Sequence, residues 1–144
     1  MRKVSAIVTA AAAGAGLLLA GAPAAPAAAA APATAAAYPF ELFGVTDYSA
    51  PANENSYYSG RVTWYNRSVT VDGTFHAYGC RRVYATAWAG ITPLDTRSSS
   101  THCNNDSEQI INLVADVPGG SDHVYISLTD ANGKVLDSGY YFRP

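Results

Sequence analysis

The stretch SVTVDGTFHA, at residues 68–77, decides the fold class of this chain. Val69, Val71 and Phe75 fall on one side of an extended chain, and polar side chains fall on the other. Alternation with a period of two is typical of a half-buried β-strand, because successive side chains point to opposite faces. The stretch therefore predicts one long strand with an apolar face toward the core.

Gly73 lies at the centre of this stretch and leaves two interpretations open. Asp72-Gly73 is a dipeptide that favours a tight hairpin turn between two short strands. A glycine inside a single strand can instead mark a bulge. We favour the single strand, because the alternation of apolar and polar side chains continues through the glycine.

The same alternation recurs on both sides of this stretch, so we expect further strands. Their apolar faces are Phe40, Leu42 and Phe43 in a cap or short first strand, Val62 and Trp64, Ile111, Leu113, Ala115 and Val117, Val124, Ile126 and Leu128, and Leu136, Tyr140 and Phe142. In residues 83–89, either the alanine face or the face with Tyr84 and Trp88 could point inward.

Turn and loop residues separate these segments. Pro118-Gly119-Gly120 and Asp130-Ala131-Asn132-Gly133 predict tight turns, since Gly and Asn tolerate a positive φ. Residues 53–56 and 92–107 predict polar loops, the second with room for a short edge strand. Short strands, frequent turns and no helical periodicity predict an all-β fold, an immunoglobulin-like antiparallel β-sandwich of about six to seven strands.

The first 37 residues differ in composition from the rest of the chain. They hold 19 alanines and no aromatic residue, and Arg2 and Lys3 precede an apolar run. A-x-A sites follow at 22–24 and 35–37, which is the pattern of a cleaved secretory signal with an Ala/Pro-rich spacer. An uncleaved membrane anchor is the alternative. We expect removal of residues 1–37 and a single secreted, extracellular domain at 38–144.

Cysteine content predicts a cross-link, and net charge excludes two classes of partner. Cys80 and Cys103 are the two cysteines, and in an exported chain such a pair predicts one disulfide. The net charge of −2 becomes −4 once Arg2 and Lys3 are removed. A mildly acidic domain has no electrostatic attraction for nucleic acid or an anionic membrane, so neither is an expected partner.

No motif for catalysis or metal binding stands out. His76, His102 and His123 are the candidate general bases, but there is no G-x-S-x-G motif and no zinc-like spacing. Asp130, Asn132 and Asp137 form only a weak calcium pattern. We therefore expect no catalytic residues, no metal and no cofactor. An enzyme would instead need one of these histidines within hydrogen-bond reach of a serine or carboxylate.

A surplus of aromatic residues is the remaining functional signal. Tyr65, Tyr84, Trp88 and Tyr125 fall on strand faces that also carry polar residues. Exposed Tyr and Trp supply rigid, amphipathic contact area, so these four residues are the candidate binding surface. The alternative is that one sheet is rich in tyrosine because Tyr and Trp favour strands.

Two segments resemble known secreted proteins. Residues 124–142, with the hairpin Leu128-Thr129-Asp130-Ala131-Asn132-Gly133, resemble the closing hairpin of small secreted immunoglobulin-like proteins, which include the chromophore-carrying neocarzinostatin family. That family has two disulfides, whereas this chain has cysteines for one, and no site residue is transferred. Residues 60–80 resemble small uncharacterised secreted bacterial β-sandwich proteins, a resemblance that implies no activity.

These observations favour a secreted, non-catalytic binding or interaction module. Its partner would be an extracellular protein, a cell-wall polymer or a glycan, and it should carry a contiguous patch of exposed Tyr and Trp. One alternative is a small-ligand carrier, which needs a deep apolar cleft between sheets. Another is an inhibitor of an extracellular hydrolase, which needs a protruding loop such as 92–107.

Overall fold

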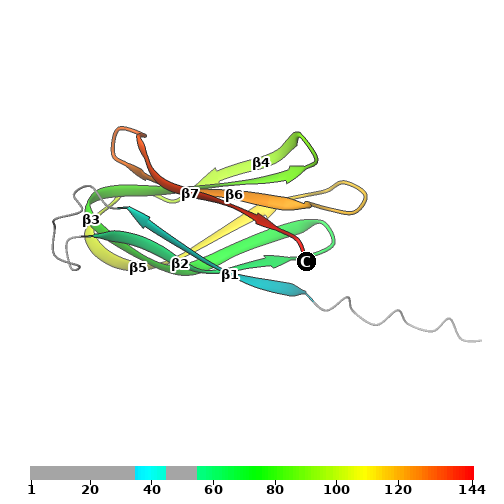
Figure 1. Ribbon diagram of the computed structural model, residues 1–144, viewed down its shortest axis with the longest axis horizontal. Helices are drawn as coiled ribbons and strands as arrows, with labels where there is room; N and C mark the ends of the chain where they lie inside the picture. The colour runs from blue at the N-terminus through cyan, green and yellow to red at the C-terminus, as the bar shows by residue number, and fades with distance from the viewer. Residues whose placement is uncertain (1–34, 45–54) are drawn as a thin grey trace, which may run out of the picture. The chain divides into compact units, whose positions relative to one another are not determined.

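The computed structural model describes residues 35–44 and 55–144, and within them it is all-β (Figure 1). The strands are β1 (Ala36–Gly44), β2 (Ser56–Trp64), β3 (Ser68–Ala89), β4 (Thr92–Ser98), β5 (His102–Val114), β6 (His123–Asp130) and β7 (Val135–Phe142). The described residues include no helix long and apolar enough to span a membrane. The expected signal segment, apart from its last three residues, and residues 53–54 of the predicted loop at 53–56 lie outside the described residues, and Ser56 begins β2.

One long strand organises the sheet. The first part of β3, residues 68–77, pairs with β2 and β5, and its second part, residues 81–89, pairs with β6 and β4. With β1 on β2 and β7 on β6, all seven strands belong to one antiparallel sheet. Figure 1 shows β3 passing from one layer to the other, so the layers are halves of one sheet that wraps nearly into a barrel. We call them the β5 layer (β1, β2, 68–77, β5) and the β6 layer (β4, 81–89, β6, β7).

A bulge marks the point where β3 changes layers. The register with β5 shifts between Ala77 and Cys80, leaving Tyr78 and Gly79 opposite Asn104. Gly79 and Asn104 both have positive φ, and the Gly79 N–H donates to Asn104 Oδ1 at 2.6 Å. A bulge bends the strand and increases its twist, which redirects β3 toward the second layer.

The predicted alternation holds through β3, so Asp72-Gly73 is mid-strand and not a turn. The alanine face of residues 83–89 points inward. The interior between the two layers is filled by Phe40, Leu42, Tyr58, Val62, Trp64, Val69, Val71, Phe75, Ala77, Val83, Ala85, Ala87, Ile111, Leu113, Val124, Ile126 and Leu128. Small alanines on β3 allow the layers to approach closely, and burial of the larger side chains supplies the main favourable term in folding.

Gly73 has a structural role that the sequence did not reveal. It lies directly opposite Gly60 of β2. A Cβ atom on Gly60 would lie 2.0 Å from the Asp72 carbonyl oxygen and 2.5 Å from the Gly73 Cα, and one on Gly73 would lie 2.2 Å from the Ser59 carbonyl oxygen. The two backbones therefore approach too closely for any side chain at these positions.

Residues 92–107 were predicted to be a polar loop, and this prediction is wrong for most of the segment. They form β4 and the first part of β5, joined at residues 99–101. Both lie at sheet edges, where their polar side chains stay exposed and backbone pairing with β3 supplies the order. Only the expected short edge strand is recovered, as β4.

Cys80 and Cys103 form the predicted disulfide. They are direct partners in the β3–β5 ladder, next to the bulge. The cross-link therefore fastens the start of β5 to the point where β3 leaves the β5 layer.

Carboxylates join the edge strands of the two layers. Asp95 of β4 accepts a hydrogen bond from the Val114 N–H of β5 at 2.9 Å, and Asp137 of β7 accepts one from the Phe43 N–H of β1 at 2.9 Å. Each bond satisfies a donor at a sheet edge that no neighbouring strand pairs, which is where sheets are most exposed to wrong pairing.

Asp95 should make stability depend on acidity. Partial desolvation raises its pKa, but hydrogen bonds from the Val114 N–H and the Arg97 side chain outweigh it, so the net pKa lies below the ordinary value. A lowered folded-state pKa means that the stabilisation is complete above the unfolded-state pKa of about 4 and is lost as pH falls through the folded value.

We therefore expect Asp95→Asn to lower the free energy of unfolding by about 1 kcal/mol at neutral pH and by less under strong acid. Urea unfolding followed between neutral pH and strong acid measures this difference. Asp116→Asn is the control, since Asp116 pairs with Arg67 at the exposed surface. An equal loss for Asp95→Asn at every pH would contradict the assigned role.

Candidate functional site

Aromatic rings cluster on the outer surface of the β6 layer. The register places Trp88 of β3, His123 of β6 and Phe142 of β7 in one row across three strands. Tyr125 and Tyr140 are paired in the next row. We call these five residues the aromatic face.

The rings of the aromatic face contact one another directly. The Trp88 and His123 rings are parallel within 5°, with centroids 6.0 Å apart. His123 lies 5.2 Å from Phe142 and 5.9 Å from Tyr140, and Tyr125 lies 4.8 Å from Tyr140. Ring pairs at these separations stabilise one another. The five side chains therefore form one continuous surface with mutual support.

The most exposed rings of this surface, Tyr140 and Phe142, were predicted to point inward with Leu136, and that prediction is wrong. They are 59% and 64% exposed. A register shift between β6 and β7 leaves Leu136 as an extra residue, because Leu128 pairs with Asp137 and Thr129 with Val135. After that bulge Tyr141 is the side chain that points inward, and its ring centroid lies 5.7 Å from that of Phe40.

Three of the four predicted binding residues lie on the outer surface of the β6 layer. Trp88 and Tyr125 belong to the aromatic face. Tyr84 lies on the same side of β3, two rows from Trp88, and the Arg82 guanidinium carbon lies 6.0 Å from the centroid of its ring. Tyr65 lies elsewhere, in the turn that joins β2 to β3, where its N–H donates to the Ser68 carbonyl. The sequence missed His123, Tyr140 and Phe142, which the pairing of β6 with β7 brings into the surface.

Hydroxyl groups surround the rings of the aromatic face. Thr86 lies beside Tyr125 in the ladder, and its Oγ1 is 3.0 Å from that of Thr96 on β4. One row further, Ser98, Tyr84, Ser127 and Ser138 follow one another across the four strands, and all but the buried Ser127 are accessible. This surface therefore offers both hydrogen-bond donors and acceptors without formal charge.

The acidic side chains of these strands are held away from the aromatic face. Asp95 and Asp137 bond to the edge strands of the β5 layer, and Asp130 accepts from the N–H groups of Asn132 and Lys134. Those last two bonds close the hairpin turn, which accounts for the weak calcium pattern without a metal. Over the described part of the chain, no group of three His, Cys, Asp or Glu residues could hold a metal ion.

Asp122 is the one carboxylate at the rim of the aromatic face. It accepts from the Gly90 N–H at 2.6 Å and contacts His123 Nδ1 at 2.6 Å. The Gly90 bond is the largest cause that holds the pKa of Asp122 below its ordinary value, with a further contribution from His123. Asp122 therefore fixes the imidazole at the centre of the surface.

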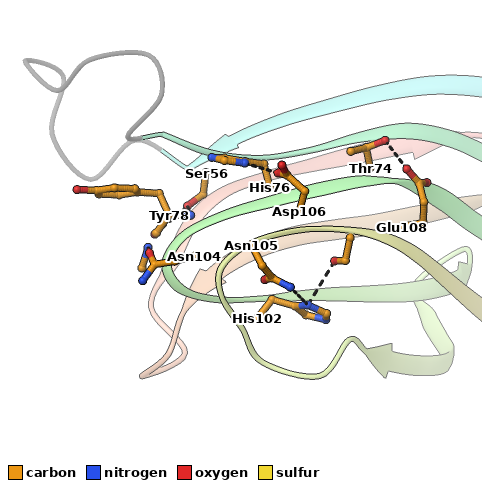
Figure 2. A network of polar contacts seen from close by, with 11 residues as sticks. Ser56, Thr74, His76, Tyr78, His102, Asn104, Asn105, Asp106 and Glu108 are labelled. Atoms are coloured by element: carbon orange, nitrogen blue, oxygen red, sulfur yellow. Dashed lines mark hydrogen bonds and ion pairs between the residues drawn. The ribbon is translucent and has the colours of Figure 1, made fainter.

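The outer surface of the β5 layer carries ionic and polar pairs beside the exposed apolar side chains Phe43, Ile110 and Val114. His76 pairs with Asp106, Thr74 Oγ1 donates to Glu108 at 2.8 Å, and Arg61 Nη2 lies 3.4 Å from Asp72. Figure 2 shows His76 pointing toward Asp106 and Thr74 pointing toward Glu108, with one member of each pair on β3 and the other on β5. We call this surface the charged face. Arg61 with Asp72 and His76 with Asp106 are its ion pairs, and Glu108 accepts from a hydroxyl group.

Each histidine has one of the partners that an enzyme would need. His76 contacts Asp106, His123 contacts Asp122, and His102 Nε2 lies 3.0 Å from Ser100 Oγ, with Ser107 Oγ 3.3 Å from its Nδ1. Nucleophilic catalysis by a serine uses an imidazole between a hydroxyl and a carboxylate. Across residues 35–44 and 55–144, no imidazole bonds to both kinds of group.

Two open grooves adjoin these surfaces. One, of about 440 Å³, borders the aromatic face and is lined by Tyr38, Tyr140, Tyr141, Phe142, Arg143 and Pro144. The other, of about 360 Å³, is lined by residues 97–100 and 109–112 and is mostly polar. Neither is the deep apolar cleft expected of a carrier, and residues 92–107 form strands where an inhibitor would need a protruding loop.

No protein-family model, curated protein or solved structure matches this chain. The aromatic face, its hydroxyl groups and the charged face are therefore the basis on which function is argued.

Proposed function

We propose that this chain is a secreted, non-catalytic binding module that contacts an extracellular partner through the aromatic face. The observation that carries the proposal is the contiguous set of rings on one sheet surface, two of which are more than half exposed. Exposed aromatic side chains in contact with one another are uncommon on a surface without a partner, because their burial by a partner is strongly favourable.

The proposal includes export and an immunoglobulin-like classification of the two layers. The A-x-A sites support export, and the Cys80–Cys103 disulfide is compatible with an oxidising extracellular environment. The small-ligand carrier and the hydrolase inhibitor have less support, because neither the grooves nor residues 92–107 offer the shape that each function requires.

The test compares two double variants in a retention assay. Mature protein from the culture medium is incubated with cell-wall fractions, insoluble glycans and immobilised proteins of the culture supernatant. We expect Tyr140→Ala/Phe142→Ala to lose most of the retention on whichever material holds the unchanged protein, since these are the two most exposed rings of the aromatic face. Far-ultraviolet circular dichroism checks that both variants stay folded.

The matched control is Phe43→Ala/Tyr65→Ala. It also removes one exposed phenylalanine and one exposed tyrosine, 49% and 46% exposed, but both lie outside the aromatic face. The control should be retained like the unchanged protein. Equal retention of both double variants would contradict the proposed binding surface.

A further inference from the structure

We propose that the partner of the aromatic face is a neutral polysaccharide, whose sugar rings stack on Trp88, Tyr140 and Phe142. This inference rests on the proposed function and specifies its ligand. Three properties of the surface support it, namely the rings, the hydroxyl groups between them and the placement of charge.

The rings provide the apolar contact. The face of an aromatic ring is electron-rich, so it attracts the weakly positive C–H groups on the flat side of a sugar ring. Trp88, His123 and Phe142 follow one another across three neighbouring strands, with centroids separated by 6.0 and 5.2 Å. A row of rings across an antiparallel sheet can be contacted by consecutive units of a linear polymer.

The surroundings provide uncharged polar contacts. Thr86, Thr96, Ser98 and Ser138 lie on the same surface as the rings, in adjacent rows of the ladder. A hydroxyl group both donates and accepts, so it can pair with a sugar hydroxyl in either orientation. Thr86 and Thr96 bond to each other, but a purely apolar partner would exclude water from the Ser98 and Ser138 hydroxyl groups, which is unfavourable.

The placement of charge argues for a neutral polymer. Asp95, Asp130 and Asp137 accept hydrogen bonds from backbone N–H groups away from the rings. Asp122, the carboxylate at the rim, is already held by the Gly90 N–H and by His123. Arg82 lies at the far end of the layer from Trp88, opposite Thr129, and stacks on Tyr84. An anionic polymer would need a cluster of Arg and Lys. Arg143, which lines the groove beside Phe142, donates to the Gly119 carbonyl and is separated from Arg82 by the length of the layer, so the two do not form a cluster.

The groove beside Tyr140 and Phe142 extends this surface toward β1. Tyr38 and Tyr141 line it, and it is open to solvent along the edge of β7. A polymer that lies across the row from Trp88 to Phe142 would reach this groove with its next unit. The site therefore suits the interior of a chain better than an isolated small sugar.

The experiment measures binding of the oxidised mature protein to cellulose, chitin and an unbranched neutral β-glucan, with polygalacturonate as the anionic polymer. We expect retention on at least one neutral polymer, and a dissociation constant that changes little with salt because no ion pair forms. Tyr140→Ala and Phe142→Ala should each weaken binding about tenfold. Phe43→Ala and Tyr65→Ala should bind like the unchanged protein.

Fluorescence supplies a second readout, because the chain has two tryptophans. Trp64 is 1% exposed in the core, whereas Trp88 belongs to the aromatic face. Binding to a soluble neutral oligosaccharide should change the emission, and Trp88→Phe should remove that change. A signal that survives Trp88→Phe would place the sugar elsewhere and overturn the inference.

The outcomes separate this inference from the proposed function. If polygalacturonate or a protein is bound and Tyr140→Ala and Phe142→Ala lose that binding, the aromatic face is the binding surface and the ligand class is wrong. If the unchanged protein forms a dimer that Phe142→Ala dissociates, and no neutral polymer is held, the partner is a second copy. If the face variants bind like the unchanged protein, both proposals fail.

Discussion

Replacement of Gly60 by alanine is expected to lower the free energy of unfolding by about 3 kcal/mol, a large part of the stability of a domain of this size. The new Cβ atom would lie 2.0 Å from the Asp72 carbonyl oxygen and 2.5 Å from the Gly73 Cα. Those neighbours are backbone, so the overlap cannot be relieved by rotating a side chain. The β2 and β3 backbones must separate, and the ladder that carries Val62, Trp64 and Val71 is disturbed with them.

Urea unfolding followed by tryptophan emission measures this loss, because Trp64 lies in β2 and is buried. Two controls distinguish the steric effect from a general cost of the substitution. Ser59→Ala changes the neighbouring residue and should be nearly neutral. Gly133→Ala has open space around it but a φ of +83°, so it should cost about 1 kcal/mol through backbone strain alone. A Gly60→Ala protein as stable as the Ser59→Ala protein would show that the two strands are further apart than described.

The alternation of side chains predicted most of the fold, because it reports directly on which residues face the core. Val69, Val71 and Phe75, which define the strand at 68–77, are all buried, and so are Val124, Ile126 and Leu128. The hairpin at 130–133 and the turn at 118–120 also form as expected, since Gly133, Gly119 and Gly120 adopt the positive φ that these turns need. What the pattern could not supply is the continuation of β3 from one layer into the other, which depends on pairing with distant strands.

The failures occur where local pattern and pairing disagree. Tyr140 and Phe142 continue an apolar alternation that starts at Leu136, but one bulge residue reverses the faces. Residues 92–107 look like a loop because edge strands need no inward apolar side chains when backbone hydrogen bonds hold them. In both cases the deciding information is the register between strands, which is absent from any single segment of sequence.

In the candidate site too, some residues could be predicted from local sequence and others depend on pairing between strands. Trp88 and Tyr125 could be found from composition and strand preference alone, and the structure places them in adjacent rows. His123 could not, because its role follows from lying between Trp88 and Phe142 in the ladder. Tyr65 was selected on the same grounds as the others but lies in a turn, so an aromatic residue near polar neighbours is not sufficient evidence for a shared surface.

The two outer surfaces differ in how their side chains are paired. The charged face pairs its ionic groups internally, as Arg61 with Asp72 and His76 with Asp106 illustrate. The aromatic face leaves its most exposed rings uncovered, with the acidic groups of the layer turned toward backbone donors. The charged face also exposes Phe43, Ile110 and Val114, but these side chains lie beside ionic pairs. The aromatic face instead combines contacting rings with uncharged hydroxyl groups, which is complementary to a partner with apolar faces and hydroxyl groups.

Removal of the disulfide by Cys80→Ala/Cys103→Ala is expected to lower the free energy of unfolding by roughly 3 kcal/mol. The two cysteines are 23 positions apart in the sequence, and the cross-link restricts the unfolded chain over that distance. The start of β5 has little else to hold it, because residues 103–106 are exposed and pair only with β3. Amide hydrogen exchange should therefore accelerate most in residues 102–107, ahead of the core strands.

Urea unfolding of the oxidised protein, the double variant and the reduced protein measures the loss. The variant should also show a larger dependence of the unfolding free energy on urea, because its unfolded chain is less compact. The aromatic face is built on the second part of β3, β6 and β7, so partner binding by the folded variant should match that of the oxidised protein. Unchanged stability together with uniform hydrogen exchange would mean that pairing with β3 alone holds β5, and that the disulfide adds nothing to the folded sheet.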